Sequence, residues 1–83
     1  MMTYTKEQVD RIFELMNVVL TKSTGKFADY AKAYADAALT AYWADGDKGL
    51  EMQIPYVLSN LQGWRGDLAR ETKKELKTFN RYC

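Results

Sequence analysis

The stretch Ile54–Leu68, with the sequence IPYVLSNLQGWRGDL, decides the fold because it joins two predicted helices through a tight corner. It begins with an aliphatic run beside the only proline of the chain and ends with a tryptophan and an arginine enclosed by two glycines. Glycine adopts backbone conformations that other residues avoid, so Gly63 and Gly66 predict the end of one helix and the start of the next. Trp64 and Arg65 then form either a plug in the core or a recognition surface, and the sequence leaves both alternatives open.

Apolar spacing predicts a helix on each side of this corner. Upstream, we expect one helix over residues 47–62 that continues through Pro55 with a kink, because the aliphatic residues keep helical spacing across the proline. These aliphatic residues are Leu50, Ile54, Val57, Leu58 and Leu61. Downstream, we expect a helix over residues 66–80 with a narrow apolar stripe from Leu68 to Phe79. Its other side is basic and consists of Arg70, Lys73, Lys74, Lys77 and Arg81.

The first half of the chain predicts two more helices. Thr5 and Gln8 have the spacing of a capping box, which indicates a helix over residues 5–22. An alanine-rich helix is expected over residues 26–44, because alanine is the best helix former. One face of it carries Phe27, Tyr30, Ala31, Tyr34, Ala38 and Ala41. We expect the alanines of this face to let another helix approach closely and the tyrosines to fill the rims of that contact. The sequence therefore predicts an all-α fold, with residues 1–83 forming a single domain built as a compact four-helix bundle of short antiparallel helices.

Composition and charge narrow the class of protein. The formal net charge of the 83 residues is only +1, which argues against a strongly electrostatic partner unless the charge is segregated. No apolar run is long enough to cross a bilayer, so we expect no membrane association. Residues 1–7, MMTYTKE, lack the apolar segment of a secretory signal, and Cys83 is the single cysteine. We therefore expect a cytoplasmic protein.

The residues needed for common catalytic sites are missing from the sequence. There is no histidine, which removes the commonest general base and metal ligand, and a single cysteine is too few for a Cys/His zinc site. The acidic residues alternate with lysines on predicted exposed faces, as they do on solvated helix surfaces. We therefore expect a non-enzymatic protein with no cofactor and no bound metal.

The aromatic residues suggest binding to another protein. Most of these rings are expected in the core, but some lie near helix ends, where they can project as anchors, since Trp, Tyr and Arg dominate binding hot spots. We expect partner-binding residues among Trp43, Tyr56, Trp64 and Arg65, and on the basic side of the last helix at Arg70, Lys73, Lys74 and Lys77. The predicted function is a protein-interaction module, which we also expect to form homo-oligomers through an Ala/Tyr face.

The alternative function is nucleic-acid binding. The corner followed by a basic helix has the outline of a helix-turn-helix, in which Arg70, Lys73, Lys74 and Lys77 face a groove of the nucleic acid. Glu71 and Glu75 on the same helix, together with the low net charge, weigh against this alternative.

Three segments resemble parts of short helical proteins encoded by bacteriophages. They are YVLSNL at residues 56–61, WRG at residues 64–66 and KKEL at residues 73–76, all in the last third of the chain. The resemblance implies an accessory protein that binds a host or phage component, such as an inhibitor of a host defence or regulatory protein. It implies no catalytic residue.

Overall fold

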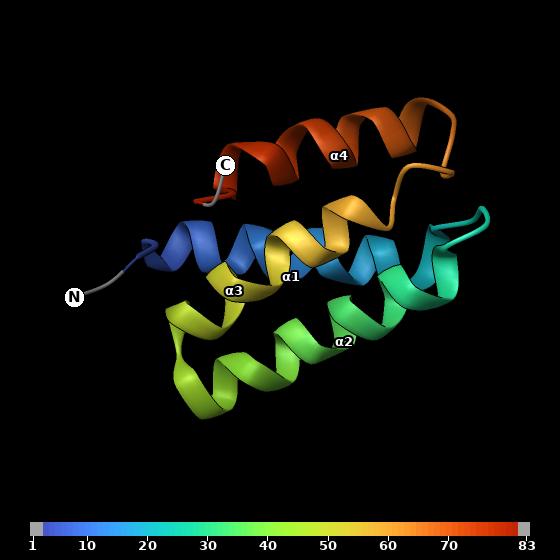
Figure 1. Ribbon diagram of the computed structural model, residues 1–83. Coiled ribbons are helices and arrows are strands. Elements are labelled where there is room, and N and C mark those ends of the chain that lie inside the picture. Colours follow the sequence, from blue (N-terminus) through green and yellow to red (C-terminus); the bar gives the residue numbers. More distant parts are fainter. Residues whose placement is uncertain (1–2, 82–83) are drawn as a thin grey trace.

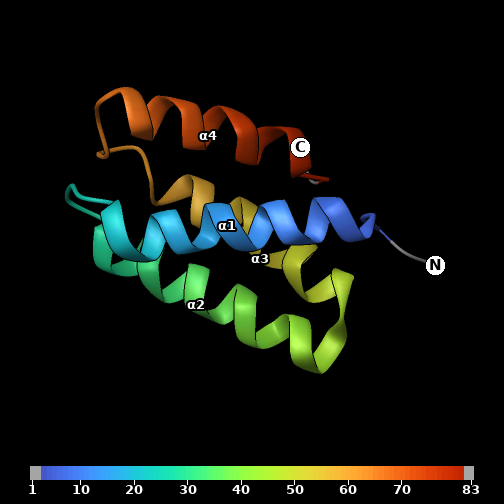
Figure 2. The same ribbon diagram turned by 180° about the vertical axis from the view of Figure 1, so that it is seen from behind.

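The computed structural model describes residues 3–81 and contains four helices among them. They are α1 (Lys6–Lys22), α2 (Ala28–Asp45), α3 (Asp47–Ser59) and α4 (Asp67–Phe79). Successive helices run in opposite directions, and α2 and α4 lie on opposite sides of the pair formed by α1 and α3 (Figure 1 and Figure 2). No strand occurs among residues 3–81. The predicted all-α bundle of four helices is confirmed.

The predicted helix ends agree with the observed ones to within two residues, except at the end of α3. The capping box of α1 forms as predicted, with Thr5 Oγ1 accepting from the Gln8 N–H at 3.1 Å and Gln8 Oε1 accepting from the Thr5 N–H at 2.8 Å. Helix α3 passes through Pro55, also as predicted. It ends at Ser59, three residues before the predicted end, because the N–H groups of the next two residues bond carbonyls only three positions back, as in a tight turn.

Three alanines form the inward face of α2. Ala31, Ala35 and Ala38 are completely buried, whereas Tyr30 is 62% exposed and Phe27 is 38% exposed. A face of small residues lets the backbones of two helices approach closely, and large rings do not fit between them. The aromatic residues of α2 therefore lie along the rims of its contacts. Leu68, predicted in the apolar stripe of α4, is likewise exposed.

The closest helix pair is α2 and α3, and a glycine permits the contact. A β-carbon at Gly49 would lie 2.5 Å from the backbone oxygen of Ala41. A β-carbon does not approach a carbonyl oxygen so closely, so only glycine fits at this position without a backbone shift. The Ala face, which we expected to mediate homo-oligomer formation, is thus already occupied by packing within the chain.

Tyr4 fixes the segment before α1 to the rest of the bundle. Its hydroxyl donates a hydrogen bond to the backbone oxygen of Phe79 at 2.5 Å, and its ring packs edge-on against the Phe79 ring. Its backbone N–H bonds the carboxylate of Asp47 at 3.1 Å. The residue thereby connects the start of α1 with the start of α3 and the end of α4.

The buried Tyr4 hydroxyl predicts a loss of stability at high pH. Burial raises the pKa of Tyr4 to about 12. The ordinary tyrosine pKa is about 10, so between pH 10 and 12 the unfolded chain releases this proton while the folded chain keeps it. The stabilisation by Tyr4 is therefore complete below pH 10 and decreases as the pH rises toward 12.

Tyr4→Phe provides the comparison. We expect the variant to be less stable than the wild type by about 1 kcal/mol at pH 8, where it lacks one hydrogen bond, and the difference to shrink above pH 10. Urea unfolding of both proteins from pH 8 to 12 measures it. A difference that stays constant over this range would contradict the account.

Candidate functional site

The corner between α3 and α4 is a packing plug, which answers the question that the sequence left open. Trp64 is only 4% exposed and belongs to the core, so the prediction that it projects toward a partner is wrong. The Lys73 ammonium donates hydrogen bonds to the backbone oxygens of Trp64 at 2.7 Å and Leu61 at 3.3 Å. Carbonyl groups after a helix end attract a cation, so Lys73 holds the corner in place.

Two glycines join this corner to the loop between α1 and α2. Both loops lie at the same end of the bundle (Figure 1). A β-carbon at Gly25 would lie 2.6 Å from the backbone of Gly63, and the φ angle of Gly25 is +108°, which L side chains rarely adopt. The two loops therefore touch through their backbones, which accounts for glycine at position 25.

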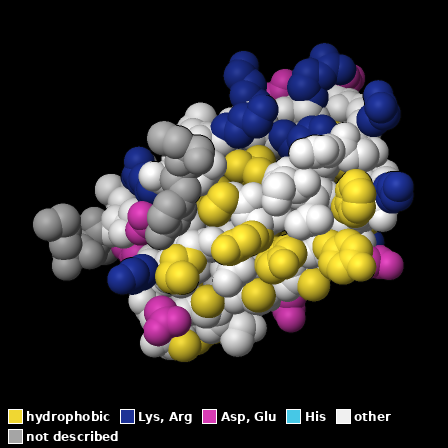
Figure 3. Space-filling view, in the orientation of Figure 1, with side chains coloured by type: hydrophobic (Ala, Val, Ile, Leu, Met, Phe, Trp, Pro, Cys, Tyr) yellow, Lys and Arg dark blue, Asp and Glu magenta, His cyan; other side chains and the backbone are white. Residues whose placement is uncertain are grey.

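An exposed apolar surface lies along the outer side of α2 and α3. We call it the seam, and it consists of Tyr30, Tyr34, Met52, Pro55 and Tyr56. Tyr34 of α2 stacks on Tyr56 of α3 with ring centroids 5.3 Å apart. Met52 is 48% exposed and Tyr56 is 52% exposed, and both line a depression of about 460 Å³ together with Pro55 and Ser59. Figure 3 shows a row of hydrophobic side chains over α3 and α2, with Lys and Arg side chains gathered over α4.

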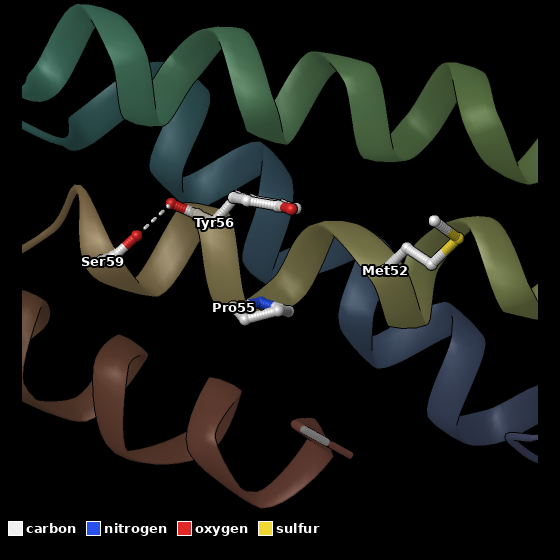
Figure 4. A pocket seen from close by; sticks show the side chains of 4 residues that line it. All are labelled: Met52, Pro55, Tyr56 and Ser59. Atoms are coloured by element: carbon white, nitrogen blue, oxygen red, sulfur yellow. Dashed lines mark hydrogen bonds between the residues drawn. The ribbon is translucent and has the colours of Figure 1, made fainter. Parts of the chain in front are cut away.

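The close view of the depression shows how α3 presents these side chains. Tyr56 and Met52 lie on the side of α3 toward α2, and Pro55 lies on the side toward α4 (Figure 4). The Ser59 hydroxyl donates to the backbone oxygen of Tyr56 at 3.1 Å, so it satisfies a carbonyl of its own helix. On this face of α3, Met52, Tyr56 and Ser59 are exposed and Pro55 is half-buried.

A second depression lies between α3 and α4 and is basic. Its volume is about 620 Å³. Leu58 and Gln62 line it from the α3 side. The lining residues from α4 are Arg70, Lys73, Lys74 and Lys77, which the sequence placed on one side of this helix. We call this depression the basic groove.

The acidic residues of α4 do not line the basic groove. Glu75 forms an ion pair with Arg11 of α1, with 2.7 Å between Nη2 and Oε1, and hydrogen bonding from Arg11 lowers the pKa of Glu75. Asp67 pairs with Arg70 at 3.1 Å. Glu71 lines a separate depression with Lys74 and Glu75. Among residues 3–81, no acidic side chain pairs with Lys74 or Lys77.

Two other predicted site residues lie outside these surfaces. Trp43 is 81% exposed near the end of α2, where its ring contacts Tyr42, which in turn packs on Phe13 of α1. Trp43 is therefore on the α1 side of α2 and not at the seam. Arg65 is exposed at the corner and lines a small depression next to the basic groove, together with Arg70.

Sequence reasoning missed Met52 and Pro55. Tyr30 and Tyr34 were predicted at the rims of a helix contact and not as partner-binding residues. The available signal was spacing: Tyr30 and Tyr34 are four positions apart, as are Met52 and Tyr56, and such pairs share a face of a helix. Spacing within one helix does not show that Tyr34 of α2 meets Tyr56 of α3.

The described part of the chain offers no metal site and no membrane span. Within residues 3–81, no three His, Cys, Asp or Glu side chains are grouped so as to hold a metal ion. None of the helices in this range is long and apolar enough to cross a bilayer. Cys83 lies outside the described residues.

The fold and these surfaces define a class: a small all-α bundle with an apolar seam beside a basic groove. Comparisons with protein-family models, with curated proteins and with solved structures find no match. The resemblance to phage-encoded helical proteins therefore stays a prediction.

Proposed function

We propose that this chain is a non-enzymatic protein-interaction module and that its partner binds at the seam. The observation that carries the proposal is that exposed Tyr56 and Met52 of α3 adjoin half-buried Tyr34 of α2, with exposed Tyr30 one helical turn before it. Soluble proteins seldom expose large apolar patches unless these serve binding, and tyrosine and methionine are enriched at interfaces. Tyr34 and Tyr56 already hold each other by stacking, so little side-chain freedom is lost on binding.

The resemblance to phage proteins extends this proposal to the kind of partner. It supports a host or phage protein in the cytoplasm as the partner and inhibition as one consequence of binding. Self-association remains part of the proposal, but a second copy has to use exposed surface such as the seam, since Ala31, Ala35 and Ala38 are buried within the chain.

Nucleic-acid binding through α4 is the second candidate function. The observation that favours it is the pairing of Glu75 with Arg11, which takes one acidic residue away from the basic side of α4. Two observations weaken it. The Lys73 ammonium is already bound to backbone oxygens, and Glu71 and Glu75 line the depression on the other side of Lys74.

Paired surface variants test the seam against the rest of the surface. We expect Met52→Ser with Tyr56→Ser to reduce capture of partner protein by the immobilised chain about tenfold or more, because each substitution removes an apolar anchor. The control, Trp43→Ser with Leu68→Ser, removes two exposed apolar side chains elsewhere and should retain the partner. Quantitative mass spectrometry of proteins captured from cell lysate measures the difference.

All four substituted residues are exposed, so we expect both double variants to stay folded, with changes near 0.5 kcal/mol per site. Thermal unfolding followed by circular dichroism checks this. The proposal is wrong if the seam variant and the control capture the same proteins in the same amounts.

A further inference from the structure

We propose that the segment recognised by this chain is an acidic amphipathic helix of the partner, lying along the outer face of α3. Its apolar side chains pack on the seam, and its carboxylates enter the basic groove. This inference rests on the proposed function, since it assumes that the seam binds protein.

The seam and the basic groove are adjacent, and α3 forms the wall between them. Pro55 and Ser59 line the apolar depression, whereas Leu58 and Gln62 line the basic groove. At 100° per residue Leu58, Pro55 and Ser59 follow one another around the outer face of α3. Leu58 and Pro55 lie toward α4, and Met52 and Tyr56 continue this face toward α2 (Figure 4). A ligand lying along this helix therefore contacts both surfaces at once.

The shape of this surface fits a helical ligand. Helix α3 has 13 residues, so the exposed face is about 20 Å long. An amphipathic helix that packs its apolar face into a groove between helices is a recurrent way of recognising a peptide. The described residues offer no strand edge to which an extended peptide could add.

The charges of the basic groove specify the polar side of the ligand. Four cationic side chains line it, and among residues 3–81 no acidic side chain pairs with Lys74 or Lys77. Complementary charge sets specificity and speeds association more than it adds affinity. A ligand with carboxylates beside its apolar face matches this arrangement, and a ligand with lysines at the same places is repelled.

Two other occupants fit less well. A nucleic acid carries phosphates along its length and would meet Glu71 and Glu75 on the far side of Lys74. A second copy would have to bring acidic residues such as Asp29 and Asp36 of α2 to the basic groove, and Lys32 lies between these two on the same side of the helix. Such a contact joins unlike surfaces and does not close into a dimer.

Binding of designed peptides tests the inference. The probe is a fluorescein-labelled helical peptide of roughly 18 residues, about five turns, with leucines on one face and glutamates flanking them. A matched peptide carries lysine at every glutamate position. We expect the acidic peptide to bind the full chain at least about tenfold more tightly than the lysine peptide, measured by fluorescence anisotropy at low and high salt.

Three double variants show how much the basic groove and the seam each contribute to peptide binding. Lys74→Glu with Lys77→Glu should abolish the preference for the acidic peptide. The matched charge control, Lys6→Glu with Lys22→Glu, changes net charge equally on exposed sites of α1 and should keep the preference. Met52→Ser with Tyr56→Ser should weaken the binding of both peptides. Lys73 is left unchanged because it holds the corner.

The outcomes separate the inference from the proposed function. The seam variant could weaken binding of both peptides while the acidic and lysine peptides bind equally well, with or without the Lys74→Glu and Lys77→Glu changes. That result overturns the acidic specificity but leaves the seam as a protein-binding surface. If neither peptide responds to the seam variant, both are overturned. If a DNA duplex of about 20 base pairs displaces the acidic peptide with steep salt dependence, the basic groove is a nucleic-acid site and the inference is overturned.

Discussion

Trp64→Ala should lower the free energy of unfolding by about 3–5 kcal/mol, the cost of truncating a large buried aromatic side chain. Trp64 is 4% exposed and packs in the core cluster. Its neighbour Arg65 is exposed and forms no ion pair among the described residues, so Arg65→Ala should change the free energy by less than about 0.5 kcal/mol. Urea unfolding followed by circular dichroism measures both variants.

The pair of variants distinguishes a packing plug from a recognition surface. If Trp64→Ala unfolds the chain outright, Trp64→Phe, which keeps an aromatic ring but leaves a smaller cavity, should give a folded protein of intermediate stability. Equal stability of Trp64→Ala and the wild type would show that the ring is not in the core. For the same reason, loss of binding in Trp64→Ala is no measure of a binding contact, since the fold is affected first.

Gly49→Ala is expected to destabilise the protein by about 1–3 kcal/mol, the typical cost of overpacking a close contact. The direction of this change in stability is informative. In a helix interior, replacing glycine with alanine ordinarily stabilises by about 1 kcal/mol through helix propensity. Here the new β-carbon would lie 2.5 Å from the Ala41 backbone oxygen, so α2 and α3 must move apart.

Ala41→Gly is the matched second-site change. It removes the Ala41 methyl group, which would lie 2.8 Å from the new β-carbon, but it keeps the carbonyl oxygen. Gly49→Ala should therefore remain destabilising in the Ala41→Gly background, as measured by thermal unfolding. A stabilising effect of Gly49→Ala in either background would show that α2 and α3 do not pack as closely as described.

Local signals sufficed to predict the helices. The capping box of Thr5 and Gln8, the alanine-rich run and the glycines at the corner each act over a few residues, so the sequence predicts their effect directly. The continuation of α3 through Pro55 was also correct, because apolar spacing persists across it. The early end of α3 at Ser59 was missed, since the chain turns there into a corner that Lys73 of α4 holds through the carbonyls of Leu61 and Trp64.

The candidate site could be predicted only in part, because it depends on how the helices pack against one another. The i, i+3, i+4, i+7 spacing of Arg70, Lys73, Lys74 and Lys77 predicted that they share a side of α4, and all four line the basic groove. Spacing within one helix does not tell which neighbour lies opposite. The contact of Tyr34 with Tyr56 and the burial of Trp64 depend on how α2, α3 and α4 meet, so neither could be predicted from one segment.

Photo-crosslinking from the seam is the most direct test of the central claim. A photoreactive benzophenone side chain replaces Tyr56 in one variant and Trp43 in the other, since both rings are exposed but lie on different sides of α2. After irradiation in cell lysate, the account predicts a discrete crosslinked partner from position 56 and none from position 43. A partner crosslinked from position 43 and not from position 56 would contradict it.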